Sequence, residues 1–211
     1  MKNRRLTTVI LMAVALVFLS AVTASGYFWK EAALATDFSR KDLSPSIAFL
    51  FGTDWMGRDM FVRTIVGLSL SIRIGLLTAA ASAVLAFLMG TAAAVMGKKT
   101  DSLICGLIDV IMGIPHILLL ILISYACGRG FWGVVVGVSL PHWTSLARLI
   151  RGAVPLLKES NYIRIAERLG HSRWYIAFRH MAPCLFPQFA VGLVLLFPHA
   201  ILHEASITFL G

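Results

Sequence analysis

Two histidines near the carboxyl end of the chain have a spacing that suits metal ligands. His199 and His203 stand four positions apart, so they share one face of a helix, and Glu204 follows directly. Imidazole is a preferred ligand of nickel, copper and zinc, so we expect this pair, with Glu204, to bind a divalent metal or its chelate transiently. The alternative is a structural role, because Pro198 frees a backbone carbonyl that a histidine can satisfy, and tight metal binding needs further ligands.

Three other polar side chains lie within apolar stretches: Asp109, His116 and His142. Exposing such groups to lipid costs roughly 3 kcal/mol or more, so they should face protein or water and are candidates for a solute pathway. Structural alternatives stay open for all three. Asp109 closely follows the cations of GKKTD and can snorkel or pair near the interface. Each of the two histidines follows a proline and can satisfy the carbonyl that the proline leaves free.

Three short motifs match enzyme signatures by letters only. GRGFWG at 128–133 has the spacing G-x-G-x-x-G, but it joins two apolar runs and lacks the preceding strand of a dinucleotide site. GTAAAVMGKKT has Lys99 where a phosphate loop has Ser or Thr. HEAS lacks the second histidine of a zinc-protease helix. We therefore expect no ATP hydrolysis by this chain, no cofactor and no catalytic residue.

The elements that must position these residues are membrane helices. Of 211 residues, 58% are hydrophobic and only 14% are charged. The net charge of +9 would suggest nucleic acid as the partner of a soluble protein, but here the cations flank apolar runs, where they orient helices in a lipid bilayer. Nucleic acid binding is therefore not expected. The three cysteines show no spacing of a disulfide framework or a thiolate metal site.

The fold class expected is all-α, a polytopic membrane helix bundle with five visible spans. Each run approaches or exceeds the about 20 apolar residues that cross a bilayer. The spans are predicted at 6–29, 69–96, 102–126, 131–147 and 183–203. Residues 1–67 form an anchor helix with an outer loop, and residues 68–211 form a transmembrane domain with a cytoplasmic loop at about 158–182. Gly133 and Gly137 form G-x-x-x-G, which predicts a close helix contact.

Charge predicts the orientation of these spans. The basic cluster Lys2, Arg4 and Arg5 places the amino end in the cytoplasm, and the first apolar run is longer than that of a cleaved secretory signal. By alternation, residues 30–67 lie outside and residues 148–182 lie inside. The inside segment holds seven cations and two acids, whereas the outside segment holds five of each. The positive-inside rule therefore supports the same orientation.

The segment YIRIAERLGHSRWYIAFRHMAP predicts a helix, a turn and a helix. The first apolar stripe repeats at i, i+4 and i+7: Tyr162, Ala166 and Leu169. The second stripe is formed by Trp174, Phe178 and Met181. Gly170 is suited to ending the first helix, Ser172 can cap the second, and Pro183 follows the second stripe. The alternative is an interfacial element that rests on anionic lipid.

This segment resembles the cytoplasmic signature of bacterial ATP-binding-cassette importer permeases, specifically the second membrane subunit of the dipeptide, oligopeptide and nickel group. The resemblance covers nearly the whole chain. The matching positions are Tyr162, Ala166, Leu169, Gly170, Ser172, Phe178, Arg179, His180 and Pro183. Arg164 and Ile165 replace the acidic position and the first alanine of the signature, so its carboxylate is missing here.

Two further segments resemble the same group. The first, FGTDWMGRDM, is similar to the G-T-D-x-x-G-R-D segment before the second span, with Gly52, Asp54, Gly57, Arg58 and Asp59. We expect these residues to form a rigid outer cap facing a solute-binding protein, and local ion pairs of a solvated loop are compatible with that role. The second, HEASITFLG, is similar to E-A-S-x-S-F-L-G, after which the group carries another span. The chain is therefore expected to lack a sixth span, either as a fragment or as a five-span variant.

The resemblance implies a non-catalytic permease subunit in the bacterial inner membrane, moving dipeptides, oligopeptides or nickel. Its implied partners are a second permease subunit, two cytoplasmic ATPases and an extracytoplasmic solute-binding protein. The ATPases would push on residues Tyr162, Ala166, Leu169, Gly170, Ser172, Trp174, Phe178 and Arg179. The histidine pair favours the nickel branch. The alternatives are a secondary transporter or channel without ATPases, for which no internal repeat is visible, and an intramembrane enzyme.

Overall fold

The computed structural model describes residues 4–128 and 130–210, and these residues contain helices and no named strand. The all-α prediction is confirmed for this part of the chain. The elements are α1 (Arg4–Phe28), α2 (Lys30–Leu34), the 3₁₀ turn η1 (Phe38–Arg40), α3 (Met60–Val95), α4 (Lys98–Gly113), α5 (His116–Ala126), α6 (Phe131–Lys158), α7 (Asn161–Arg168), α8 (Arg173–Ile176), the π-helical turn η2 (Ala177–Met181) and α9 (Ala182–Leu210). Lys2 of the basic cluster and Gly211 of the last motif lie outside the described residues.

The chain forms two compact units, Met1–Arg73 and Ile74–Gly211. In the first unit, α1 exposes large apolar side chains along its length and buries only Val22 and Gly26. Gly26 permits a close helix contact, because a Cβ there would lie 2.1 Å from Cβ of Ser69. The Ser69 hydroxyl donates to the carbonyl of Thr23 at 3.1 Å. An apolar outer surface on a 25-residue helix suits lipid, which agrees with the first predicted span.

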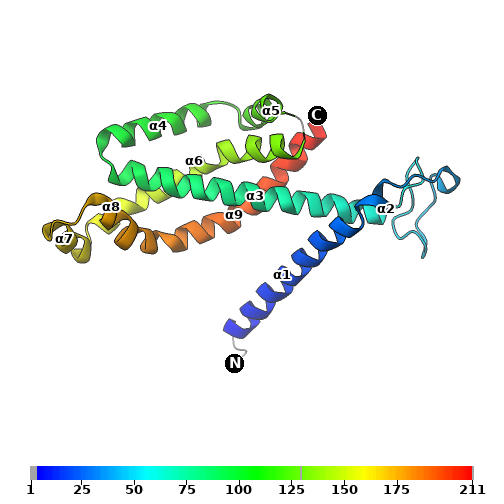
Figure 1. Cartoon of the computed structure of the whole chain (residues 1–211), viewed down its shortest axis with the longest axis horizontal. Coiled ribbons are helices and arrows are strands. Elements are labelled where there is room, and N and C mark those ends of the chain that lie inside the picture. The colour runs from blue at the N-terminus through cyan, green and yellow to red at the C-terminus, as the bar shows by residue number, and fades with distance from the viewer. Residues whose placement is uncertain (1–3, 129, 211) are drawn as a thin grey trace. The chain divides into compact units, whose positions relative to one another are not determined.

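The second unit is a helix bundle arranged around α6. Figure 1 shows α6 running between α4 and α9, and α5 and α7 also contact it. Small residues bring α3 against α6: a Cβ on Gly90 would lie 2.7 Å from the carbonyl oxygen of Ala147. The hydroxyl of Ser82 donates to the carbonyl of Ser139 at 3.0 Å. Close backbone approach at small residues is typical of membrane helices, where lipid supplies no hydrophobic force between helices.

The predicted G-x-x-x-G contact is confirmed between α5 and α6. A Cβ on Gly137 would lie 2.0 Å from Oγ of Ser124, and one on Gly133 would lie 1.7 Å from the carbonyl oxygen of Gly128. Neither position has room for a side chain. The two glycines therefore set how closely the start of α6 approaches α5.

Among the described residues, three helices are long and apolar enough to cross a membrane: α1, α3 and the continuous helix Arg173–Leu210. α4 and α5 together would make a fourth, as a pair bent by 99°. The sequence predicted one span over 102–126, but the helix breaks at Ile114 and Pro115. Proline has no N–H and drives the preceding residue out of the helical region, and Ile114 accordingly has ψ 138°.

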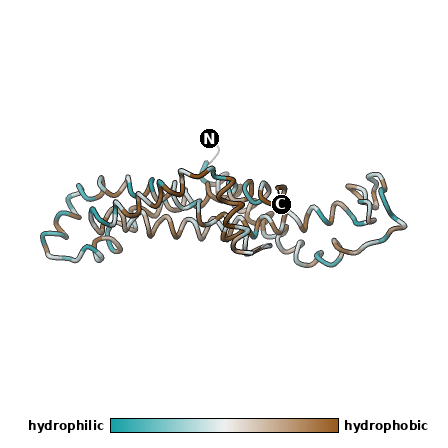
Figure 2. The backbone as a smooth tube through the Cα atoms, turned by 90° about the horizontal axis from the view of Figure 1, so that it is seen from above, coloured by the Kyte–Doolittle hydropathy of each residue, from teal (hydrophilic) through white to brown (hydrophobic). Residues whose placement is uncertain are grey.

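The span predicted at 131–147 lies within α6, which continues to Lys158, so the predicted helix end at Ala147 was wrong. Two ion pairs join this extension to α4. Arg148 contacts Asp109 at 2.7 Å, and Arg151 donates to Asp101 at 2.7 Å. Figure 2 shows hydrophobic residues along the long helices of this unit and hydrophilic residues at the end that carries α7.

Candidate functional site

The helix α7 ends in a Schellman motif centred on Gly170. Gly170 has φ +80°, and its N–H donates to the carbonyl of Glu167 at 3.0 Å. The N–H of His171 donates to the carbonyl of Ala166 at 3.2 Å. These two bonds satisfy carbonyls at the helix end, and the left-handed conformation between them favours glycine. The glycine turn predicted from the sequence is therefore confirmed.

Ser172 caps the helix that follows, as predicted, by accepting a hydrogen bond from the N–H of Tyr175 at 3.2 Å. This helix does not end near Pro183, where the sequence placed the start of a separate span. It runs from Arg173 to Leu210 through the π-helical turn η2. That turn lies just before Pro183, where the helix lacks an N–H donor, and π turns commonly absorb such interruptions. α8 and α9 are thus parts of one helix.

The two short helices turn apolar side chains outward. In α7, Ile163 and Ala166 are buried, whereas Leu169 at its end is 71% exposed. In α8 and η2, the exposed rings of Trp174 and Phe178 stack with centroids 5.7 Å apart. Five of the exposed apolar side chains form what we call the coupling patch: Tyr162, Ile165, Leu169, Trp174 and Phe178. Arg164 and Arg179 are exposed charged residues of the same segment.

In the first unit, Asp54 organises the segment that resembles the outer cap. One of its carboxylate oxygens accepts the N–H groups of Met56 and Arg58, each at 2.9 Å. The other accepts from Nε of Arg58 at 2.8 Å and pairs with Arg63. The hydrogen bond from the Arg58 side chain holds the pKa of Asp54 well below its usual value. The carboxylate is therefore a fixed part of this turn.

The neighbouring glycines and Asp59 complete the cap. Gly52 and Gly57 have φ of +71° and +72°, and a Cβ on Gly57 would lie 1.7 Å from the carbonyl oxygen of Asp37. Asp59 accepts the N–H of Phe61 at 2.8 Å and so caps the start of α3. The predicted hydrogen-bonded turn is present. Its contact with a solute-binding protein stays a prediction.

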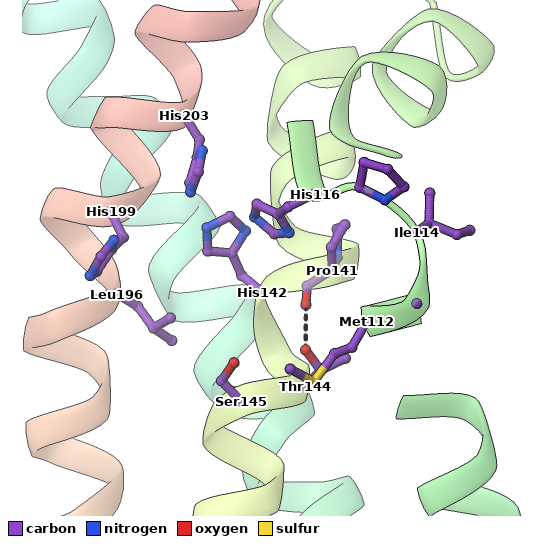
Figure 3. A pocket seen from close by; sticks show the side chains of 12 residues that line it. Met112, Ile114, His116, Pro141, His142, Thr144, Ser145, Leu196, His199 and His203 are labelled. Atoms are coloured by element: carbon purple, nitrogen blue, oxygen red, sulfur yellow. Dashed lines mark hydrogen bonds between the residues drawn. The ribbon is translucent and has the colours of Figure 1, made fainter. Parts of the chain in front are cut away.

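A pocket of about 660 Å³ lies in the second unit where the break between α4 and α5 meets α6 and α9. Four of its lining residues are histidines: His116, His142, His199 and His203. Figure 3 shows the imidazoles of His116, His142 and His203 pointing toward one another from three different helices. Beside them, the hydroxyl of Thr144 donates to the carbonyl of Pro141 at 2.9 Å. The pocket volume falls in the range of about 300–1,000 Å³ that is usual for small-molecule sites.

The three converging histidines form a nearly equilateral group, which we call the histidine cluster. Their ring centroids are 4.7, 4.9 and 5.0 Å apart, and one nitrogen of each lies within 4.8 Å of those of the other two. Nδ1 of His142 lies 2.7 Å from the carbonyl oxygen of Val138. A histidine bond to a helix carbonyl was the predicted structural alternative, although the carbonyl freed by Pro141 is that of Gly137.

The predicted pair His199 and His203 is divided by the structure. His203 joins the histidine cluster, whereas His199 lines the pocket one helical turn earlier. Glu204 is buried and accepts a hydrogen bond from Thr208 at 3.1 Å. Asp109 is exposed and has the cationic partner, Arg148, that its structural alternative requires. His116 and His142 each follow a proline, but His203 does not, so no pattern in the sequence indicated that these three histidines would meet.

Comparisons with known proteins agree with this architecture. A family described as "Binding-protein-dependent transport system inner membrane component" matches residues 82–211. The chain is 30% identical over 210 residues to the oligopeptide transport system permease protein OppC of Bacillus subtilis (strain 168), covering 100% of this chain and 68% of that protein. It is 29% identical over 197 residues to the dipeptide transport system permease protein DppC of the same organism, covering 93% of this chain and 62% of that protein. The chain thus spans roughly two thirds of the length of these relatives.

Proposed function

Because this chain belongs to the family of binding-protein-dependent transport system inner membrane components, we propose that it is a non-catalytic permease subunit of an ATP-binding-cassette importer. Its long apolar helices agree with a multi-pass protein of the inner membrane. In this proposal, the energy comes from two cytoplasmic ATPases, and a second permease subunit completes the pathway. The amino end lies in the cytoplasm, as the distribution of cations favours.

One structural observation carries the proposal: a single continuous helix contains part of the coupling patch and part of the pocket lining. Trp174 and Phe178 lie at the start of the helix Arg173–Leu210, and His203 lies near its other end. A displacement of α8 by a partner therefore moves α9 with it, because no loop separates these two elements. Apolar side chains on a short amphipathic helix are suited to a groove on a partner protein.

We take short peptides as the cargo, because the relatives are named as oligopeptide and dipeptide permeases. The 660 Å³ pocket, with its mixed hydroxyl, imidazole and apolar lining, forms part of the pathway in this proposal. The outer cap around Asp54 faces the solute-binding protein, since its turn is rigid and its neighbours Phe51 and Trp55 expose apolar rings. The nickel branch has no comparable support from the relatives.

Copurification tests the proposal. A tagged chain recovered from its native membrane should carry two ATP-binding-cassette subunits and a second permease, and the assembled complex should hydrolyse ATP when a peptide and its binding protein are present. Leu169→Ala combined with Trp174→Ala should release the ATPases but retain the second permease. Leu103→Ala, at an α4 side chain that is 74% exposed, is the matched control and should retain both. Peptide transport by a chain that recovers no ATPase would favour a secondary transporter instead.

A further inference from the structure

We propose that His116, His142 and His203 form an exchangeable binding site for a divalent transition metal ion. The site lies in the pocket that the proposed function assigns to the pathway. Any part that the bound ion has in solute uptake rests on that proposed function, whereas metal binding by the cluster does not. The chemistry is that of imidazole nitrogen, which favours nickel, copper and zinc over calcium and magnesium.

The geometry of the cluster suits a single ion. Two imidazole nitrogens on one tetrahedral zinc ion lie about 3.4 Å apart, given zinc–nitrogen bonds of about 2.0–2.1 Å. Here the three nitrogens lie within 4.8 Å of one another, so each has to move by about 1 Å or less toward a common centre. The ring planes are inclined by 62–69° to one another, so no two rings stack and block that centre. Small rotations of the side chains close the site.

The hydrogen bond of His142 determines which of its nitrogens can bind a metal. A carbonyl oxygen only accepts, so Nδ1 of His142 must carry the proton that it shares with Val138 at 2.7 Å. In the neutral ring, Nε2 then has a free lone pair for the metal. Donation of the other ring N–H to a backbone carbonyl is a common arrangement around metal-binding histidines, because it fixes both the tautomer and the ring orientation.

Two of the proposed ligands directly follow prolines that interrupt helical hydrogen bonding. Pro115 ends the break between α4 and α5 and places His116 at the first residue of α5. Pro141 interrupts the hydrogen bonding of α6 directly before His142. His142 is buried, His203 is half-buried and His116 is exposed, so the cluster has both a fixed inner ligand and an open side. Three protein ligands with an open position are typical of zinc sites that exchange water or substrate.

Cobalt binding to the full chain tests the site without reference to transport. The chain is purified in detergent with a tag that contains no histidine and is titrated with Co²⁺, whose visible absorption reports low-symmetry nitrogen coordination. We expect one ion per chain and displacement by Zn²⁺. Affinity should increase from Co²⁺ to Ni²⁺ to Cu²⁺ in competition with a chromophoric chelator. A wild-type chain that gives no saturable cobalt absorption overturns the proposal.

Substitutions locate the ligands. His116→Ala and His203→Ala should each weaken binding by roughly 10–100-fold or more, the effect seen even for outer hydrogen-bonding partners of a metal site. His171→Ala, outside the pocket, is the matched control and should bind as the wild type does. His199→Ala should retain the cobalt spectrum. An equal loss of cobalt affinity in His199→Ala and His116→Ala would refute the assignment of the ligands. Unchanged cobalt affinity in both His116→Ala and His203→Ala would refute it too.

Folding and function have separate readouts. His142→Gln keeps a polar side chain of similar length but removes the imidazole nitrogen that would bind the metal. A correctly inserted variant without cobalt absorption therefore supports the site. Insertion is measured as recovery from membranes as a monodisperse species. Failure of the chain to recover ATPases would refute the proposed importer function and leave the cobalt result standing. A wild-type chain that takes up peptide but shows no cobalt absorption would refute the metal site alone.

Discussion

Replacing Gly170 should uncouple ATP hydrolysis from solute without unfolding the protein. The residue holds φ +80° in the Schellman motif that ends α7. No described atom lies within 4 Å of the place where a Cβ would stand. A side chain at this position therefore acts through the backbone conformation alone and not through a steric clash.

The magnitude follows from the cost of the left-handed conformation. For a residue with a Cβ that cost is roughly 1–2 kcal/mol, with asparagine at the low end and a β-branched residue at the high end. A penalty of this size lowers the population of the native turn by roughly 5–30-fold if nothing else holds it. It is small beside the total stability of a membrane bundle, so the angle between α7 and α8 should change while the bundle stays folded.

A series at this position makes the prediction quantitative. In the assembled importer, the stimulation of ATP hydrolysis by solute should decrease in the order Gly170, Gly170→Asn, Gly170→Ala, Gly170→Val, with valine losing roughly fivefold or more. Gly152→Val is the control, because Gly152 lies in α6 without positive φ and with open space around it. Recovery of inserted protein should be equal throughout.

Two results would refute this reasoning. If Gly170→Val couples as well as the wild type, the left-handed turn is not needed to transmit motion from α7 to α8. If Gly170→Asn is as poor as Gly170→Val, the backbone preference is not the cause, because asparagine tolerates this conformation far better than valine does.

Two other predictions concern the outer cap and the orientation of the chain. Because the fold lowers the pKa of Asp54, its carboxylate is ionised and stabilises the cap fully above about pH 4. This stabilisation is lost only as the pH falls below that value and the carboxylate becomes protonated. Amide hydrogen exchange at Met56, corrected for the intrinsic rate, should stay slow down to about pH 4 and become faster at lower pH. Asp54→Asn should remove this increase in exchange at low pH. An increase in exchange that begins near pH 6 would contradict the role of Asp54 in the cap. In a chain without its native cysteines, a cysteine at Ser172 should react with an impermeant reagent only after the cytoplasmic side is opened, and one at Ser44 should react from outside. Labelling in the reverse order would overturn the orientation and the ATPase docking role.

The features that the sequence determined by itself are those made by neighbours along the chain. The first span follows from one uninterrupted apolar run, and its lipid-facing surface needs no packing partner. The turn at Gly170 and the cap at Ser172 are made by hydrogen bonds between residues within five positions of one another, so residue types alone indicate them.

Helix ends were harder to predict where a proline lies within an otherwise helical apolar run. Pro115 breaks the helix sharply, whereas Pro141 and Pro155 are carried inside α6 and Pro183 is absorbed by a π turn. The same residue type thus has different outcomes within one chain, and the presence of a proline alone does not predict whether a helix ends there.

The histidine cluster was decided only by the tertiary structure. Spacing along the chain singled out His199 and His203, because a pattern of i and i+4 describes one helix face. The structure instead combines His203 with His116 and His142, since the 99° bend after α4 turns the start of α5 toward α6 and α9. The distance between side chains on different helices is set by crossing angles and by close contacts such as that of Gly137 with Ser124, and no local spacing encodes it.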